Sequence, residues 1–186
     1  LVDHNPYVTK DILRELRSTI RQTVSEIRGL VYDLRPPTLD EMGLIGAIHE
    51  RIKDLAAPSS TQRGIVMRDR PTFILNAHEQ LPELPAAVEV AAYRITTEAI
   101  VNVLRHAKAK TCNITLAYKN QQERGLIITI EDDGIGVSPI RKNKKNSGIG
   151  IGSMKERAAE LGGRFCLEPN VQGGTVITVF LPVNTE

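Results

Sequence analysis

The chain has 186 residues, of which 41% are hydrophobic and 25% are charged. This length allows one ordinary domain with an appended element, and the composition excludes a fibrous or disordered class. The net charge of +2 is too small to indicate a nucleic-acid partner, which normally binds a strongly basic face.

The cysteines and the apolar runs give two further expectations. Cys112 and Cys166 lack the C-x-x-C spacing of zinc or redox sites, so we expect reduced core thiols. No apolar run reaches the roughly 18 residues of a membrane span. We therefore expect a cytoplasmic domain, and the sequence leaves open whether the full-length protein is anchored in a membrane.

The N-terminal third predicts two helices separated by a hinge. Apolar residues recur at steps of three and four from Ile12 to Arg35, which indicates an amphipathic helix with a coiled-coil-like stripe. Pro36 and Pro37 end this helix. Thr38 and Glu41 have the spacing of a capping box for a second helix that runs to about residue 55. Residues 36 to about 43 are the predicted hinge.

The rest of the chain has a mixed α/β pattern. It predicts two helices, an internal hairpin and further strands. The helices are Pro85–His106 and Ser153–Leu161, the hairpin strands are Thr111–Tyr118 and Leu126–Glu131, and the other strands are Ile65–Phe73, Arg164–Glu168 and Thr175–Leu181.

The first group of candidate site residues lies on the helix over Pro85–His106. Glu98, Asn102 and His106 are spaced by four and therefore share one helical face. Each of them alone is better explained by simple exposure to water. An Asn amid an apolar run is less easily explained in that way, and its side-chain oxygen suits a hard cation such as Mg²⁺.

The second group is Asp132, Gly134 and Gly136, where an apolar strand ends. A carboxylate there can accept a hydrogen bond from an exocyclic amine, and the glycines let the backbone approach a ligand. The D-x-G-x-G pattern alone is weak, because many ordinary turns contain Asp and Gly.

The third group is Gly148, Gly150 and Gly152, a glycine loop that leads into a helix. Its backbone amides and the helix N-terminus form a ready anion site, although a flexible loop is an equal alternative. It is neither a P-loop nor a dinucleotide fingerprint. The preceding segment Val137–Ser147 carries four cations, Arg141, Lys142, Lys144 and Lys145, which are either solvated surface or part of a mobile lid.

The order of these groups, followed by Gly173-Gly174-Thr175, resembles the N, G1 and G2 boxes of the GHKL ATP-binding superfamily, which includes gyrase, MutL and histidine kinases. The segments Leu34–Leu44 and Met154–Ala158 look like the sensor kinases that pair with NarL-type response regulators. The resemblance covers nearly the whole chain.

This resemblance implies an α+β fold, a two-layer α/β sandwich with a mixed sheet covered by helices on one face. It also implies ATP and Mg²⁺ as ligands. A long helix from a dimerisation bundle precedes the sandwich, with 1–36 as the truncated dimerisation and phosphoacceptor domain, 37–60 as hinge and linker helix, and 61–186 as the ATP-binding catalytic domain. The full-length protein would be a homodimer.

The resemblance also assigns roles to individual residues. Asn102 matches the Mg²⁺-binding Asn, and Glu98 matches the acidic residue of the N box. Together these two residues correspond to the catalytic group of the family. The other matches are to nucleotide-binding positions: Asp132 at the adenine amino group, Gly134 and Gly136 beside it, Gly148, Gly150 and Gly152 at the phosphates, Thr175 near the adenine, and Arg105 and His106 in the N box. Arg105 replaces a common Lys, which keeps the charge but changes the geometry.

One departure limits the expected activity. Such kinases carry a phosphoacceptor His followed by an acidic residue on an earlier helix, and none of His4, His49, His78 or His106 stands in that context. We therefore expect an ATP-binding fragment of a histidine kinase that cannot phosphorylate itself. Two alternatives remain: an ATPase of the gyrase or MutL kind in which Glu98 activates water, and a non-catalytic module that pairs through the Leu13–Leu34 stripe.

Overall fold

The computed structural model describes residues 35–56, 70–77, 81–121, 123–136 and 149–183. Contacts divide the chain into two units, Leu1–Pro36 and Pro37–Glu186, and the fold described below is that of the second unit. The helix expected over Ile12–Arg35 lies outside the described residues except for its last position.

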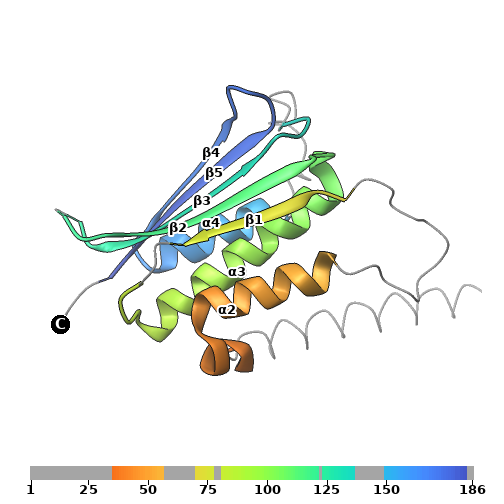
Figure 1. Cartoon of the computed structure of the whole chain (residues 1–186). Helices are drawn as coiled ribbons and strands as arrows, with labels where there is room; N and C mark the ends of the chain where they lie inside the picture. Colours follow the sequence, from red (N-terminus) through yellow and green to blue (C-terminus); the bar gives the residue numbers. More distant parts are fainter. Residues whose placement is uncertain (1–34, 57–69, 78–80, 122, 137–148, 184–186) are drawn as a thin grey trace, which may run out of the picture. The chain divides into compact units, whose positions relative to one another are not determined.

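The described part of the chain folds around a five-stranded sheet (Figure 1). The strands are β1 (Thr72–Ala77), β2 (Thr111–Lys119), β3 (Gly125–Asp132), β4 (Arg164–Pro169) and β5 (Thr175–Pro182). They lie side by side in the order β1-β2-β3-β5-β4. Only β1 and β2 pair in parallel, and the other pairs are antiparallel, so the sheet is mixed.

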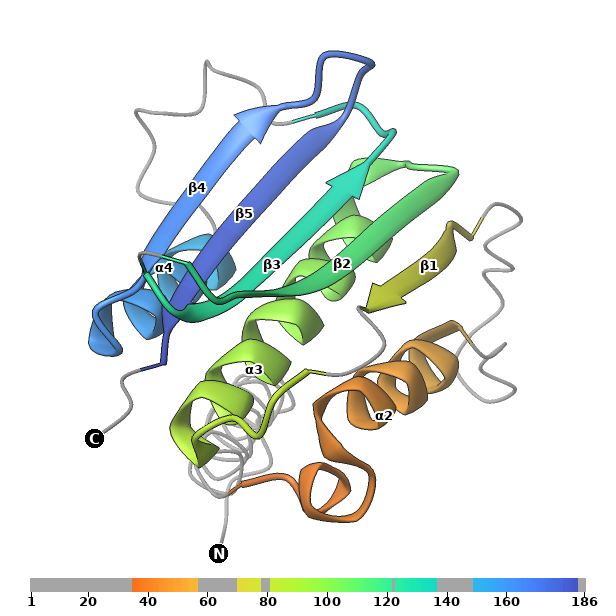
Figure 2. The ribbon, with the colours of Figure 1, turned by 60° about the vertical axis from the view of Figure 1, so that its left-hand side comes forward.

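In the described part of the chain, three α-helices cover one face of this sheet (Figure 2). They are α2 (Pro37–Ala56), α3 (Ala86–Asn102) and α4 (Ile149–Glu160), with α3 packed against both of the others. The expected two-layer α+β sandwich is confirmed. Among the described residues, no helix combines the length and the apolarity that a bilayer crossing needs.

The core lies between the helices and the inner face of the sheet. Along β2, the side chains of Cys112, Ile114 and Leu116 are fully buried, whereas the residues between them are partly exposed. This period of two is expected of a sheet that is covered on one face only. From the helical layer, Ile95 and Ile100 of α3 fill the core.

Helix α2 differs from its prediction. It begins at Pro37, so Thr38 lies inside the helix rather than capping it, and Gly43 interrupts it with φ 67° and ψ −180°. Residues on both sides of this kink, Leu39 and Leu44, are buried in the core. The segment predicted as a hinge is therefore mostly a helical turn that packs against the rest of the unit.

Two other expectations need correction. The strand predicted over Ile65–Phe73 is observed as β1, which runs from Thr72 to Ala77, and residues 65–69 lie outside the described part. Both cysteines are free thiols, but only Cys112 is a core residue, because Cys166 is exposed on the edge strand β4. The hairpin β2–β3 and the closing strands β4 and β5 are confirmed.

Candidate functional site

Helix α3 carries two polar side chains, Glu98 and Asn102, at the edge of its apolar face. Both are half-buried, on a helix whose residues Ala99 and Ile100 are fully buried. The side-chain nitrogen of Asn102 is buried and has no hydrogen-bond partner among the described residues. An unpaired buried amide is costly, so a ligand that engages this side chain relieves that cost. Rotation of the amide can turn its oxygen toward a cation.

The helix changes geometry directly after Asn102. The segment η1 (Val103–Ala107) is a π-helical turn, and Lys108 then adopts a left-handed conformation with φ 51°. The prediction of one regular helix up to His106 was therefore wrong in its last turn. Arg105 and His106 lie on η1 and are exposed. Single π-helical turns are rare and occur often at functional sites.

Asp132 is the last residue of β3 and lies on the covered face of the sheet. Only 6% of it is exposed, and its Oδ1 accepts a hydrogen bond of 2.9 Å from the Gly134 amide. A carboxylate that is nearly buried at a strand end has few other partners. It can therefore receive a hydrogen bond from a ligand that enters beside the loop.

The loop after Asp132 is held against η1. The Ile135 amide donates a hydrogen bond of 2.8 Å to the Ala107 carbonyl oxygen. Gly134 lies so close to the same oxygen that any side chain there would overlap it. Glycine is required at position 134 by this close approach of two backbones.

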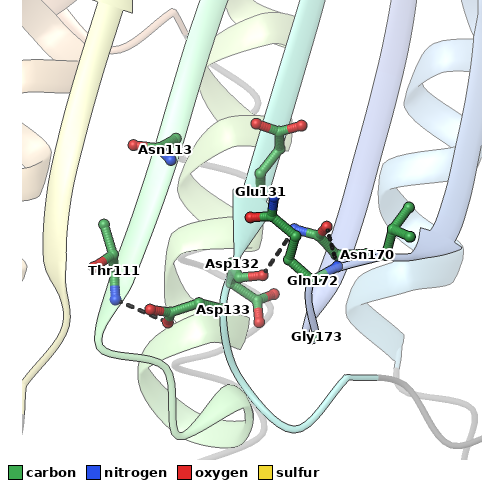
Figure 3. Close-up of a pocket in the computed structure, with 9 residues that line it drawn as sticks. Thr111, Asn113, Glu131, Asp132, Asp133, Asn170, Gln172 and Gly173 are labelled. Atoms are coloured by element: carbon green, nitrogen blue, oxygen red, sulfur yellow. Dashed lines mark hydrogen bonds between the residues drawn. The ribbon is translucent and has the colours of Figure 1, made fainter.

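The β4–β5 turn encloses Asp132 from the other side. Gly174 has φ 95°, and a Cβ on it would overlap the Asp132 carbonyl oxygen. The Asn170 side-chain nitrogen donates to that oxygen over 3.4 Å, while its Oδ1 accepts a hydrogen bond of 3.2 Å from the Gln172 amide (Figure 3). Thr175 follows as the buried first residue of β5. The sequence pointed to the glycine pair but gave no signal for Asn170.

The predicted glycine loop is partly helical. Gly150 and Gly152 lie in the first turn of α4 rather than in a loop, and Gly148 lies outside the described residues, as does the expected lid Val137–Ser147. A Cβ on Gly150 would overlap the Glu98 carboxylate and lie 3.3 Å from the Asn102 side-chain nitrogen. The first turn of α4 therefore packs directly on the polar edge of α3.

The structure thus forms two groups from the predicted site residues. Glu98, Asn102 and Gly150 meet where α3 and α4 touch. Asp132 and its glycine loop meet the β4–β5 turn at the end of the sheet. Gly136 belongs to the second group, since a Cβ on it would lie 2.9 Å from the Gly174 carbonyl oxygen.

A cavity of about 440 Å³ lies beside the second group (Figure 3). Its lining includes Thr111, Asn113 and Glu131, which alternate along β2 and β3 with buried residues and so lie on the uncovered face of the sheet. The cavity therefore opens away from the helices. It is separate from the meeting point of α3 and α4, although Asp132 also borders it.

Residues 87–185 match the family described as histidine kinase-, DNA gyrase B- and HSP90-like ATPases. The chain belongs to this family of ATPases. The match begins in α3 and ends just after β5, so it includes both groups of site residues described above. The family is one of ATP-binding domains, which agrees with the resemblance read from the sequence.

Two curated relatives of this ATPase-family chain are histidine kinases by name. The chain is 29% identical over 174 residues to the signal transduction histidine-protein kinase/phosphatase DegS of Brevibacillus brevis, covering 94% of the chain and 41% of the relative. It is 27% identical over 189 residues to an uncharacterized sensor-like histidine kinase of Chloroflexus aurantiacus, covering 100% of the chain and 30% of that relative. The chain thus spans less than half the length of both.

Solved structures of the same ATPase type share the fold. The histidine kinase domain of the blue-light activated histidine kinase of Erythrobacter litoralis EL346 matches with a TM-score of 0.52 and 16% identity, over 87% of this chain and 84% of that one. The ATP binding domain of PrrB from Mycobacterium tuberculosis matches with a TM-score of 0.51 and 18% identity, over 76% and 92% of the two chains.

Proposed function

We propose that this chain is the ATP-binding catalytic part of a sensor histidine kinase, which transfers the γ-phosphoryl group of ATP to a histidine that lies outside the chain. The observation that carries the proposal is the buried side-chain nitrogen of Asn102, which lies against the first turn of α4 and has no hydrogen-bond partner among the described residues. That turn offers backbone amides and a helix N-terminus to an anion, next to a side chain able to bind a cation. A nucleotide triphosphate with its magnesium ion presents both.

Each group of site residues would bind one end of the nucleotide. The Asp132 carboxylate would accept a hydrogen bond from the exocyclic amine of adenine, with Gly134, Gly136 and Thr175 around the base. The N-terminal turn of α4, with Gly150 and Gly152, would donate backbone hydrogen bonds to the phosphates. Arg105 is exposed on η1 and would add positive charge there, with the exposed His106 beside it in sequence.

The Asn102 side-chain oxygen would hold Mg²⁺, and Glu98 would orient the groups around it. When bound, the ion neutralises charge that develops on the transferred phosphoryl group. The protein then contributes mainly position, because phosphoryl transfer needs the donor and the acceptor nitrogen to be aligned. The acceptor would be a histidine nitrogen, and the phosphoryl group would pass on to an aspartate of a response regulator.

The finer assignments rest on sequence motifs. The Leu34–Leu44 segment supports a regulator of the NarL class, and the Leu13–Leu34 stripe supports a homodimer of the full-length protein. The division into 1–36, 37–60 and 61–186 is proposed on the same basis. A cytoplasmic location, with or without a membrane anchor elsewhere in the full-length protein, also stays a prediction.

Isothermal titration calorimetry of the 186-residue chain with ATP tests the nucleotide site. We expect Asp132→Asn to weaken ATP binding by about tenfold or more, as the loss of a charged hydrogen bond does. Asn102→Ala should remove most of the dependence of affinity on Mg²⁺. Glu131→Gln is the matched control, because Glu131 lies on the uncovered face of the sheet, and this variant should keep the wild-type affinity for ATP. An absence of ATP binding by the wild-type chain refutes the proposal.

Incubation with γ-labelled ATP separates a kinase fragment from an ATPase. The chain alone should form no stable phosphohistidine, and it should hydrolyse ATP slowly. Rapid hydrolysis that Glu98→Gln abolishes would instead support an ATPase of the gyrase or MutL kind, in which Glu98 activates water.

A further inference from the structure

The carboxylate of Asp133 binds the backbone at the start of β2, and we call this pair of hydrogen bonds the bracket. Its Oδ1 accepts two backbone hydrogen bonds. One of 2.7 Å comes from the Lys110 amide, and one of 2.9 Å comes from the Thr111 amide, the latter drawn in Figure 3. The Asp133 backbone amide also donates a hydrogen bond of 3.3 Å to the Thr111 carbonyl oxygen. Hydrogen bonds to an ionised acceptor are stronger than those between neutral groups. Asp133 thus connects two chain segments that are far apart in sequence.

These segments lead directly to the two groups of site residues. Asp133 follows Asp132, and Lys110 and Thr111 follow η1, which continues the helix that ends at Asn102. The bond from the Ile135 amide to the Ala107 carbonyl oxygen joins the same two segments a few residues away. The spacing between Asp132 and Asn102 therefore depends on how firmly these segments are held together.

We propose that Asp133 is a positioning residue for the nucleotide, because its carboxylate fastens the loop after Asp132 to the start of β2, which follows the helix that carries Asn102. A single ATP molecule can then reach both residues at once. This inference rests on the proposed nucleotide site, but it concerns a residue with no direct ligand role. The same backbone hydrogen bonds, that from Thr111 foremost, lower the pKa of the Asp133 carboxyl below its ordinary value.

The bracket predicts different effects on nucleotide affinity for two substitutions of Asp133. Both amides donate to the same oxygen, so the side-chain oxygen of Asp133→Asn can replace it, whereas Asp133→Ala removes the acceptor. Glu131→Ala is the matched control, since it removes a neighbouring carboxylate of the same cavity that takes no part in the bracket.

The experiment measures ATP–Mg²⁺ affinity by calorimetry and amide hydrogen exchange at Lys110 and Thr111. Asp133→Ala should weaken binding by about tenfold and expose both amides to exchange. Asp133→Asn should restore protection and bring the affinity to within about threefold of wild type, which corresponds to about 0.65 kcal/mol. Glu131→Ala should change neither. If Asp133→Ala does not fold, Asp133→Glu replaces it, because the longer side chain misplaces the carboxylate while the charge is kept.

Two outcomes overturn the inference. One is wild-type affinity in Asp133→Ala, or in Asp133→Glu where that variant is used. The other is a loss in Asp133→Asn as large as in the variant without the acceptor, which would show that charge rather than the bracket matters. In both cases the wild-type chain still binds ATP, so the proposed function stands. A wild-type chain that binds no ATP refutes the proposed function itself, and the inference with it.

Discussion

Gly150 lies directly against the carboxylate of Glu98, so closely that a Cβ at position 150 would overlap a carboxylate oxygen. This contact joins the first turn of α4 to the polar edge of α3. It also distinguishes two glycines that look equivalent in the sequence, because no other described residue, apart from the backbone of α4 itself, comes within 4 Å of the place that a Cβ on Gly152 would take.

Gly150→Ala is expected to disturb the site more than the fold. The overlapping atom is the end of a flexible side chain, so Glu98 can turn away at a cost of about 0.5–1.5 kcal/mol. If this cost arises on binding, it corresponds to a roughly two- to thirteenfold loss of ATP–Mg²⁺ affinity. Gly152→Ala should raise the free energy of unfolding by about 0.5–1 kcal/mol, because alanine has the higher helix propensity. If urea denaturation shows an equal increase in the free energy of unfolding for both variants, the predicted contact between Gly150 and Glu98 is wrong.

Gly43→Ala should destabilise the protein through the backbone alone. Gly43 has φ 67° and ψ −180°, and a Cβ on it would meet nothing within 4 Å among the described residues outside its own helix backbone. The strained conformation costs a residue with a side chain about 1–3 kcal/mol. Met42→Ala is the control, because this neighbouring residue is 54% exposed. This substitution should change the free energy of unfolding by no more than about 0.5 kcal/mol. Equal denaturation midpoints for the two variants would argue against the kink.

The two cysteines should differ in reactivity toward an alkylating reagent. Burial, with the nearby charges of Asp132 and Asp133, raises the pKa of the Cys112 thiol to about 12. The reactive thiolate is therefore almost absent at pH 8. Cys166 is exposed, although its own pKa is raised by desolvation and by Glu168. Mass spectrometry should find only Cys166 modified in the native protein, and both after denaturation; early labelling of Cys112 would contradict its burial.

The Asp133 carboxylate should make stability depend on pH in the acid range. Its folded-state pKa lies below the ordinary value of 3.8, so the unfolded chain binds this proton more readily. The stabilising contribution is complete above that ordinary value and is lost as the pH falls through the lower folded-state pKa. Asp133→Asn keeps an acceptor oxygen but cannot ionise. The difference in free energy of unfolding between wild type and this variant should therefore shrink below pH 3.8; a constant difference would argue against the shift.

Most of the architecture could be predicted because it depends on local patterns. The alternation of apolar and polar residues along β2 and β3 gave the hairpin, and the uninterrupted run after Pro85 gave α3. The order of motifs then pointed to the fold family. These patterns can be recognised because burial on one face makes apolar residues recur with the period of the strand or helix.

The features that were missed depend on contacts between distant segments. The π-helical turn η1 follows from a shift in backbone hydrogen bonding that no residue type in Val103–Ala107 signals. The helical state of Gly150 goes against its propensity and accompanies packing on Glu98. The bracket formed by Asp133 exists only after β2 and β3 have paired, so the sequence could not reveal it.

Within the described part of the chain, helices cover only one side of the sheet, and this arrangement has a consequence for how the chain can diverge. Residues that alternate along one strand face different demands: Ile114 must fit a packed interior, whereas Asn113 and Thr115 lie on the uncovered side. Related sequences can therefore change every second residue of β2 without repacking the nucleotide side. New surface properties can be acquired there while the ATP-binding side stays as it is.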